Sequence, residues 1–252
     1  MTRIAFISDI HANLEALRSV LAHIDQVGAD MAVCLGDVVG YGAAPIECIE
    51  LIREREIQTV MGNHDEYATL VMDPRIERLR PEIRQSIEWT QEQLFNYPKD
   101  DLIKWLSKLP DRMDGGDFEV LHSSYASPRW AYCMDEPTFD RNFKAQGPQL
   151  AFCGHSHSPL FGFMAEDGRP IIDYIRGDNR KTRIAPEFKS MVNVGSVGQP
   201  RDKDPRACVV FFEMESRELW LDRVEYDIEA ASKRIEAAGL PQKFADRLKV
   251  GA

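Results

Sequence analysis

The sequence predicts an α/β fold, and its two halves indicate this in different ways. In the first half, apolar runs at residues 3–7, 31–35 and 57–61 alternate with two amphipathic segments, which is the pattern of a β-α-β-α-β unit. The second half is rich in short β-branched and aromatic runs, and Asp167-Gly168 between two of them is a hairpin signal. We therefore expect parallel strands covered by helices, followed by a β-rich half.

Capping and turn residues place the helices of the first half. Asn13 suits a helix N-cap before apolar residues at helical spacing, and Pro45 suits the first turn of a helix that runs to about residue 55. A short helix at residues 227–238 is expected to close the chain. Further strands are expected at residues 118–121, 150–153, 160–164, 170–175, 191–194, 207–213 and 218–226.

The middle of the chain departs from the alternating pattern. Residues 82–109 have helical character, so we expect a helical excursion over about residues 67–112 within a single domain of residues 1–252. Two irregular loops are expected, at residues 123–135 and at the polar and basic residues 176–187.

Composition narrows the class of protein. The formal net charge of −10 over 252 residues argues against binding to duplex DNA, which needs a basic face. It does not exclude anionic substrates, because divalent cations can reverse the local field. No apolar run of the sequence approaches membrane-spanning length, and we expect no signal peptide because the first apolar residues meet Asp9 too early. The five widely spaced cysteines resemble reduced core residues. We therefore expect a cytoplasmic protein without a membrane partner.

Polar clusters follow several of the expected strands, and they contain every histidine except His23. In an extended strand, side chains two residues apart share a face, so Asp9 and His11 could reach one ion if that extension continues, as could His155 and His157. The clusters are Asp9-x-His11, Gly36-Asp37, Gly62-Asn63-His64-Asp65, His122 and Gly154-His155-Ser156-His157.

The donor atoms in these clusters exceed what one ion needs. Four imidazoles, two carboxylates and one amide are too many for a single tetrahedral zinc, and they suit two ions about 3.5–4 Å apart that share a carboxylate. A nitrogen and oxygen donor set without sulfur indicates manganese, iron or zinc.

These motifs, which span residues 9–157, resemble the ordered motifs of the calcineurin-like metallophosphoesterases. Residues 193–201 resemble a segment of the bacterial phosphodiesterase branch of that family. The resemblance implies a two-sheet β-sandwich flanked by helices, with four αββα layers. Ser123 and Val194 depart from that branch, which often has glycine and proline there, and this bears on substrate preference more than on metal binding.

The resemblance also implies roles for the motif residues. It implies two divalent ions, with manganese expected first and iron, zinc or nickel as alternatives, and hydrolysis by a hydroxide that bridges them. His64 would stay unligated and face the substrate beside Asn63, as a general acid or as a donor to phosphate. Asp9, His11 and His157 would hold the first ion, Asn63, His122 and His155 the second, and Asp37 would bridge both.

Five residues outside the ligand set have two interpretations each. Arg129 and Arg201 could bind substrate phosphate, or they could form surface salt bridges. Trp130 and Tyr132 could stack on a base or aryl group, although packing is the better interpretation. Asp65 could orient a neighbouring group or cap the following helix.

The sequence thus predicts a dinuclear phosphoesterase that hydrolyses phosphodiester bonds of small or nucleotide-like substrates. A phosphomonoesterase or protein phosphatase with the same metal centre is the alternative, and an inactive binding scaffold is a third. The oligomeric state stays open.

Overall fold

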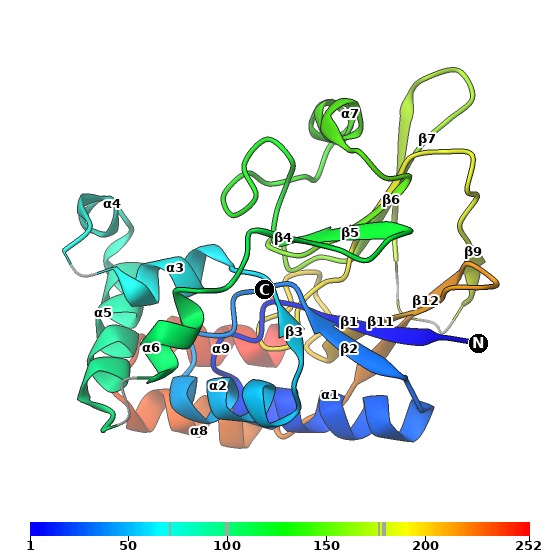
Figure 1. Ribbon diagram of the computed structural model, residues 1–252. Coiled ribbons are helices and arrows are strands. Elements are labelled where there is room, and N and C mark those ends of the chain that lie inside the picture. The colour runs from blue at the N-terminus through cyan, green and yellow to red at the C-terminus, as the bar shows by residue number, and fades with distance from the viewer. Residues whose placement is uncertain (71, 99–100, 176, 178–179) are drawn as a thin grey trace.

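The computed structural model describes residues 1–70, 72–98, 101–175, 177 and 180–252, and it contains two six-stranded mixed sheets (Figure 1). The first sheet has the order β3-β2-β1-β11-β12-β9, in which β1, β2 and β3 are parallel and β11 runs antiparallel to β1. Its strands are β1 (Arg3–Ile7), β2 (Met31–Cys34), β3 (Gln58–Thr59), β9 (Thr182–Arg183), β11 (Ala207–Glu213) and β12 (Glu218–Val224).

The second sheet has the order β4-β5-β6-β10-β7-β8. Here β5, β6 and β10 are parallel, and β7 and β8 form the hairpin expected around Gly168. Its strands are β4 (Arg112–Asp114), β5 (Phe118–Leu121), β6 (Leu150–Cys153), β7 (Leu160–Met164), β8 (Pro170–Tyr174) and β10 (Ser190–Asn193).

An aromatic cluster joins the inner faces of the two sheets. Phe6 of the first sheet stacks on Phe152 of the second with ring centroids 3.9 Å apart, and Phe118 meets Phe6 edge to face at 5.4 Å. Phe212 lies 5.7 Å from Phe152. Aromatic pairs of this geometry add to the gain from burying apolar area. The predicted two-sheet sandwich is confirmed.

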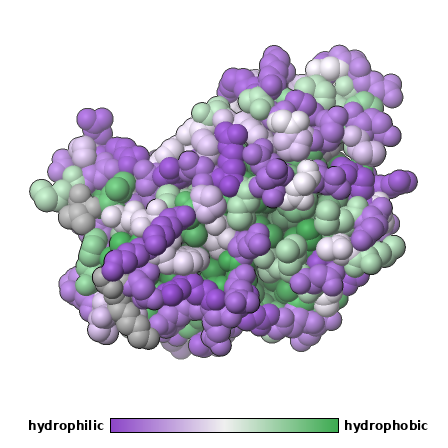
Figure 2. All heavy atoms as spheres, viewed as in Figure 1, coloured by the Kyte–Doolittle hydropathy of each residue, from purple (hydrophilic) through white to green (hydrophobic). Residues whose placement is uncertain are grey.

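Helices cover the outer face of each sheet (Figure 1). Helices α1 (Leu14–Val27) and α2 (Pro45–Glu54) pack on the first sheet, and α7 (Glu136–Ala145) packs Phe139 and Phe143 on the second. Helices α8 (Ile228–Ala237) and α9 (Gln242–Val250) form a pair beside α1. Hydrophilic residues predominate on the face shown in Figure 2. The four-layer αββα arrangement is confirmed.

The helical excursion expected over about residues 67–112 is divided into separate helices in the described residues. It consists of α3 (Asn63–Thr69), α4 (Pro74–Glu77), α5 (Pro81–Asn96) and α6 (Asp101–Leu106). Helix α5 ends two residues before Pro98, whose ring cannot continue a helix. The expectation that a helix at residues 227–238 closes the chain is wrong, because α9 follows it.

The sequence contains capping and packing signals for two helices, α7 and α9, that we did not predict from it. Asp135 and Thr138 form a capping box at the start of α7, and α9 buries Phe244 and Leu248 on one face before Gly251 ends it in a left-handed conformation. All five cysteines are buried and none is in a disulfide, as expected. Among the described residues, the helices are too short or too polar to cross a membrane. The expected loop at residues 176–187 lies partly outside the described residues.

Candidate active site

The predicted ligand residues lie directly after strands β1, β2, β5 and β6, or at the start of α3, where the two sheets meet. The expected extended geometry is wrong, because β1 ends at Ile7 and β6 at Cys153. Five predicted ligand residues instead have left-handed backbones with φ between 48° and 65°: Asp9, His11, Asp37, His155 and His157. Such conformations are costly for residues other than glycine and concentrate at functional sites. The side chains converge through these turns.

Glycines let the ligand turns approach one another closely. A Cβ on Gly62 would lie 2.1 Å from Asp37 Oδ1 and 2.3 Å from the Asp37 backbone nitrogen. One on Gly154 would lie 2.6 Å from Asp9 Oδ2. Both glycines are therefore needed for the close packing of the ligand loops.

We expect Gly62→Ala to destabilise the protein by about 1–3 kcal/mol, because the added methyl group must displace the backbone of Asp37. Denaturant unfolding measures this. Gly147→Ala is the matched control, since a Cβ there meets nothing within 4 Å, and its stability should equal that of the parent protein. Equal stabilities of the two variants would contradict the packing explanation.

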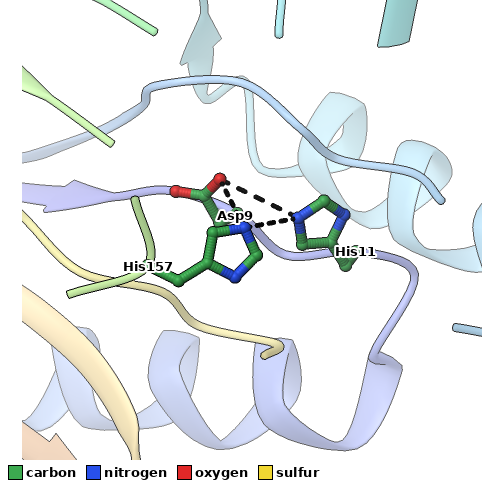
Figure 3. A group of neighbouring side chains, drawn as sticks. All are labelled: Asp9, His11 and His157. Atoms are coloured by element: carbon green, nitrogen blue, oxygen red, sulfur yellow. Dashed lines mark hydrogen bonds and ion pairs between the residues drawn. The ribbon is translucent and has the colours of Figure 1, made fainter. Parts of the chain in front are cut away.

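The first group of side chains is Asp9, His11 and His157 (Figure 3). The two Nε2 atoms are 3.1 Å apart, and Asp9 Oδ1 lies 3.3 Å from that of His157 and 3.8 Å from that of His11. Asp9 Oδ1 is buried without a hydrogen-bond partner.

Backbone carbonyls fix which nitrogen of each ring faces this group. His11 Nδ1 lies 3.1 Å from the carbonyl of Val39, and His157 Nδ1 lies 2.6 Å from that of Gln199. A carbonyl only accepts, so both Nδ1 atoms donate, and in the neutral rings both Nε2 atoms carry lone pairs. Two lone pairs and a carboxylate oxygen that face one another fit a shared cation.

Backbone carbonyls also orient the two histidine rings of the second group, which consists of Asn63, His122 and His155, but the two rings use opposite nitrogens. His122 donates from Nδ1 to the carbonyl of Leu35 (2.7 Å), whereas His155 donates from Nε2 to that of Trp130 (3.2 Å). His122 Nε2 consequently faces His155 Nδ1 and Asn63 Oδ1, each at 3.2 Å. These three atoms form a second cluster of acceptors.

Asp37 lies between the two groups. Its Oδ2 is 3.6 Å from His11 Nε2 and 3.4 Å from His122 Nε2, while its Oδ1 accepts from the backbone N–H of His64 (2.8 Å). One carboxylate oxygen thus contacts a nitrogen from each group.

The electrostatics of the buried cluster favour positive charge at its centre. Burial raises the pKa of Asp9 to about 7. Burial opposes a charge on His122, but the Asp37 carboxylate raises the pKa of that ring to about 9. Cations would relieve both effects, because ligands deprotonate when they bind a metal. The residues present therefore fit two divalent cations.

Comparison with known proteins identifies the family. Residues 2–217 match the calcineurin-like phosphoesterase superfamily domain. The chain belongs to this superfamily. An uncharacterized protein from Methanocaldococcus jannaschii is 35% identical over 253 residues, 98% of each chain. The crystal structure of a metallophosphoesterase from Sphaerobacter thermophilus is similar, with a TM-score of 0.85, 36% identity and coverage of 100% of this chain and 99% of that chain.

A hypothetical protein from Pyrococcus horikoshii shares the fold, with a TM-score of 0.79, 20% identity and the same coverage. The family match and the Sphaerobacter structure show that this chain has the metallophosphoesterase fold and belongs to a family of hydrolases that act on phosphoesters. Its Asp and His clusters could hold divalent metals.

His64 is placed differently from the other histidines of this phosphoesterase. It is the second residue of α3, and its Nδ1 is buried beside Gly40 without a hydrogen-bond partner, so Nε2 is the nitrogen left to contact a ligand in the cavity that His64 lines. Burial lowers the pKa of His64 to about 4. The ring of Tyr41 packs on it at 4.4 Å. His64 also lies within ligand distance of His11 and Asp37, so its unligated role stays a prediction.

Asp65 both caps α3 and fixes the loop after β2. Its Oδ2 accepts from the backbone N–H of Gly62 (3.1 Å), and its Oδ1 accepts from those of Val38 (2.9 Å) and Val39 (3.2 Å). Val39 in turn supplies the carbonyl that orients His11. The capping interpretation is confirmed.

A cavity of about 230 Å³ opens beside the phosphoesterase centre. Six of the lining side chains are polar or charged: Asp37, Asn63, His64, His155, His157 and Arg201. The other six are aromatic or aliphatic: Tyr41, Tyr67, Leu79, Ile83, Trp130 and Tyr132. Sequence reasoning missed Tyr67, Leu79 and Ile83, which lie on or beside the excursion helices and belong to no motif.

The structure separates the two predicted arginines. Arg201 lines the cavity. Arg129 does not, because its guanidinium is paired with Glu66 (2.6 Å) and Asp111 (2.7 Å). We therefore withdraw Arg129 from the predicted substrate-binding residues. The alternative interpretation of Arg129 as a salt-bridge residue accounts for its contacts.

The two aromatic residues of the 123–135 loop both pack and line the cavity. Trp130 meets Tyr67 edge to face at 4.9 Å, and Arg75 lies over the Trp130 ring at 5.2 Å. Tyr132 stacks on His155 at 4.2 Å and is 50% exposed. The exposed ring face of Tyr132 leaves surface for a ligand group.

Proposed function

We propose that this protein is a dinuclear metal-dependent phosphodiesterase that acts on small or nucleotide-like phosphodiesters. The position of Asp37 carries the proposal, because one oxygen lies within 3.6 Å of a nitrogen from each of the two acceptor groups. Asp9, His11 and His157 would hold one ion, Asn63, His122 and His155 the other, and Asp37 both. The sulfur-free donor set supports manganese as the first metal to test.

The ions and the side chains would divide the chemistry. Two bound divalent cations would activate water as a nucleophile and offset the charge that develops on the phosphoryl oxygens. His64 is neutral at pH 7 by its lowered pKa, so Nε2 can donate one hydrogen bond to a phosphate oxygen or to the departing oxygen. A bound phosphate beside the ring would favour its protonated form and allow proton transfer from Nε2.

The composition of the cavity supports a diester over a monoester. The cavity lining includes the apolar side chains of Leu79, Ile83 and Trp130 as well as His64 and Asp37. A diester presents one negative charge and a second substituent, and an apolar surface can bury that substituent. A monoester offers no such group.

We expect an aryl phosphodiester such as bis(p-nitrophenyl) phosphate to be hydrolysed with a higher kcat/KM than p-nitrophenyl phosphate at saturating manganese. The ratio of the two kcat/KM values measures transition-state discrimination directly. Ile83→Asp places a carboxylate among the apolar side chains that line the cavity. It should lower kcat/KM for the diester more than kcat/KM for the monoester. A preference for the monoester would instead favour the phosphatase interpretation and leave the metal centre unaffected.

A further inference from the structure

Two arginines, one of which lines the cavity, lack a carboxylate partner within the described part of the chain. Among the described residues, Arg201 and Arg247 are half-buried and form no ion pair with a carboxylate. Arg217 is a third half-buried arginine without an ion pair, but it donates to the carbonyl of Ile184. A half-buried charge without a counter-ion is costly. Six half-buried arginines do have Asp or Glu partners: Arg3, Arg53, Arg129, Arg206, Arg223 and Arg234.

Tyr41 brings Arg201 and Arg247 to the same place. The Arg201 Cζ lies 5.7 Å from the centre of the Tyr41 ring, and the other side of this region is α9, whose Phe244 ring lies 4.9 Å from that of Tyr41. Leu248 packs in the same cluster. Arg247 lies on α9 between these two residues, and the charge of Arg201 acts on its guanidinium, so the two arginines lie near each other.

The surroundings of the two guanidiniums are positive. Burial, and then the charge of Arg201, lowers the pKa of Arg247, and the exposed Arg80 acts in the same direction. Glu82 is also near, but it is paired with Lys243 at 3.0 Å. Arg201 donates to the amide oxygen of Gln199 (2.8 Å), while its Nε is buried without a hydrogen-bond partner. The unused donor and the adjacent like charge favour a bound anion.

We propose that Arg201 and Arg247 form an anion subsite beside the metal centre, which binds a second phosphate group carried by the substrate. This rests on the proposed function, because Arg201 lines the cavity that would receive the scissile phosphate. Guanidiniums bind phosphate oxygens through paired hydrogen bonds. Helix α9 lies beyond residues 2–217, which match the family, so Arg247 is a contribution of the C-terminal helix.

A matched pair of nucleotides tests the subsite without turnover. Thymidine 3′,5′-bisphosphate and thymidine 5′-monophosphate differ by one phosphate, and calorimetry on the manganese-loaded protein measures both affinities. We expect the bisphosphate to bind roughly tenfold more tightly, which is the size of effect that charge-assisted hydrogen bonds give. Arg247→Gln should bring the ratio of affinities close to one, and Arg247→Lys should keep part of the preference.

Arg183→Gln is the matched control, because Arg183 is an exposed arginine on β9 at the far edge of the first sheet. It removes the same charge and should keep both the preference and the activity. Equal affinities for the two nucleotides in the parent protein, or an unchanged preference in Arg247→Gln, would overturn the subsite.

A parallel pair of substrates tests its use in catalysis. The hydrolysis of thymidine 5′-(p-nitrophenyl phosphate) is compared with that of its 3′-phosphorylated form. In every variant, the ratio of the two kcat/KM values should change in parallel with the ratio of the two nucleotide affinities. A ratio of one in the parent protein would overturn the second phosphate as a substrate feature. If neither ester is cleaved, the proposed function fails, and the nucleotide affinities still decide whether the subsite exists.

Discussion

Asp37→Asn is expected to remove metal from both sites and to lower turnover by more than roughly 10³-fold, since the cations supply several kcal/mol of transition-state stabilisation. The reason is the place of Asp37 Oδ2 between His11 and His122. Asparagine keeps the shape of the side chain but removes the negative charge that two cations would share. Metal content per chain and kcat on bis(p-nitrophenyl) phosphate are the measurements.

Two further variants sharpen this result. Asp9→Asn should mainly weaken the first site, because Asp9 Oδ1 faces the rings of His11 and His157, whereas its Oδ2 accepts only from the backbone N–H of His155 among the second group. Asp25→Asn removes an exposed carboxylate that pairs with Arg55 and should leave metal content unchanged. A single ion per chain in fully active parent protein would contradict the dinuclear proposal.

His64→Ala is expected to lower kcat by roughly 10²–10⁴-fold while the protein keeps both metal ions, which is the range typical of a lost general acid. The ring presents Nε2 to the cavity, and its Nδ1 is enclosed beside Gly40, so the residue can act on substrate without holding a cation. Metal content and kcat must be measured on the same sample.

His23→Ala is the control, because His23 pairs with Asp222 on the outer face of the first sheet, away from the cavity. Its kcat and metal content should match those of the parent protein. Loss of metal in His64→Ala would show that His64 is a ligand, and unchanged turnover would remove it from the reaction.

The set of residues that converge could be predicted because ligand chemistry resides in side chains. Polar clusters after strands in an α/β pattern place Asp9, Asp37, His122 and His155 at one edge, and the structure brings them there. The predicted backbone geometry was wrong, because several of these residues lie in left-handed turns and not in extended strands. Backbone conformation at a non-glycine residue depends on tertiary packing, which a single sequence does not display.

Other features of the site depend on groups that any residue provides. The carbonyls of Val39, Leu35 and Gln199 fix the histidine tautomers, but every residue has a carbonyl. Arg247 is more than 40 residues from the last motif, and its helix α9 meets the cavity residue Tyr41 through the packing of Phe244. Side-chain pattern therefore predicted the donors and missed what orients and surrounds them.

The position of β1 at the middle of its sheet has a consequence for biosynthesis. Its partner on one side is β11, with Arg3 opposite Glu213, so β1 must wait after its synthesis for a strand made about 200 residues later. The carbonyl of Gln199, which orients His157, becomes available at nearly the same time. The candidate metal centre is consequently completed late, after the nascent chain has closed its first sheet.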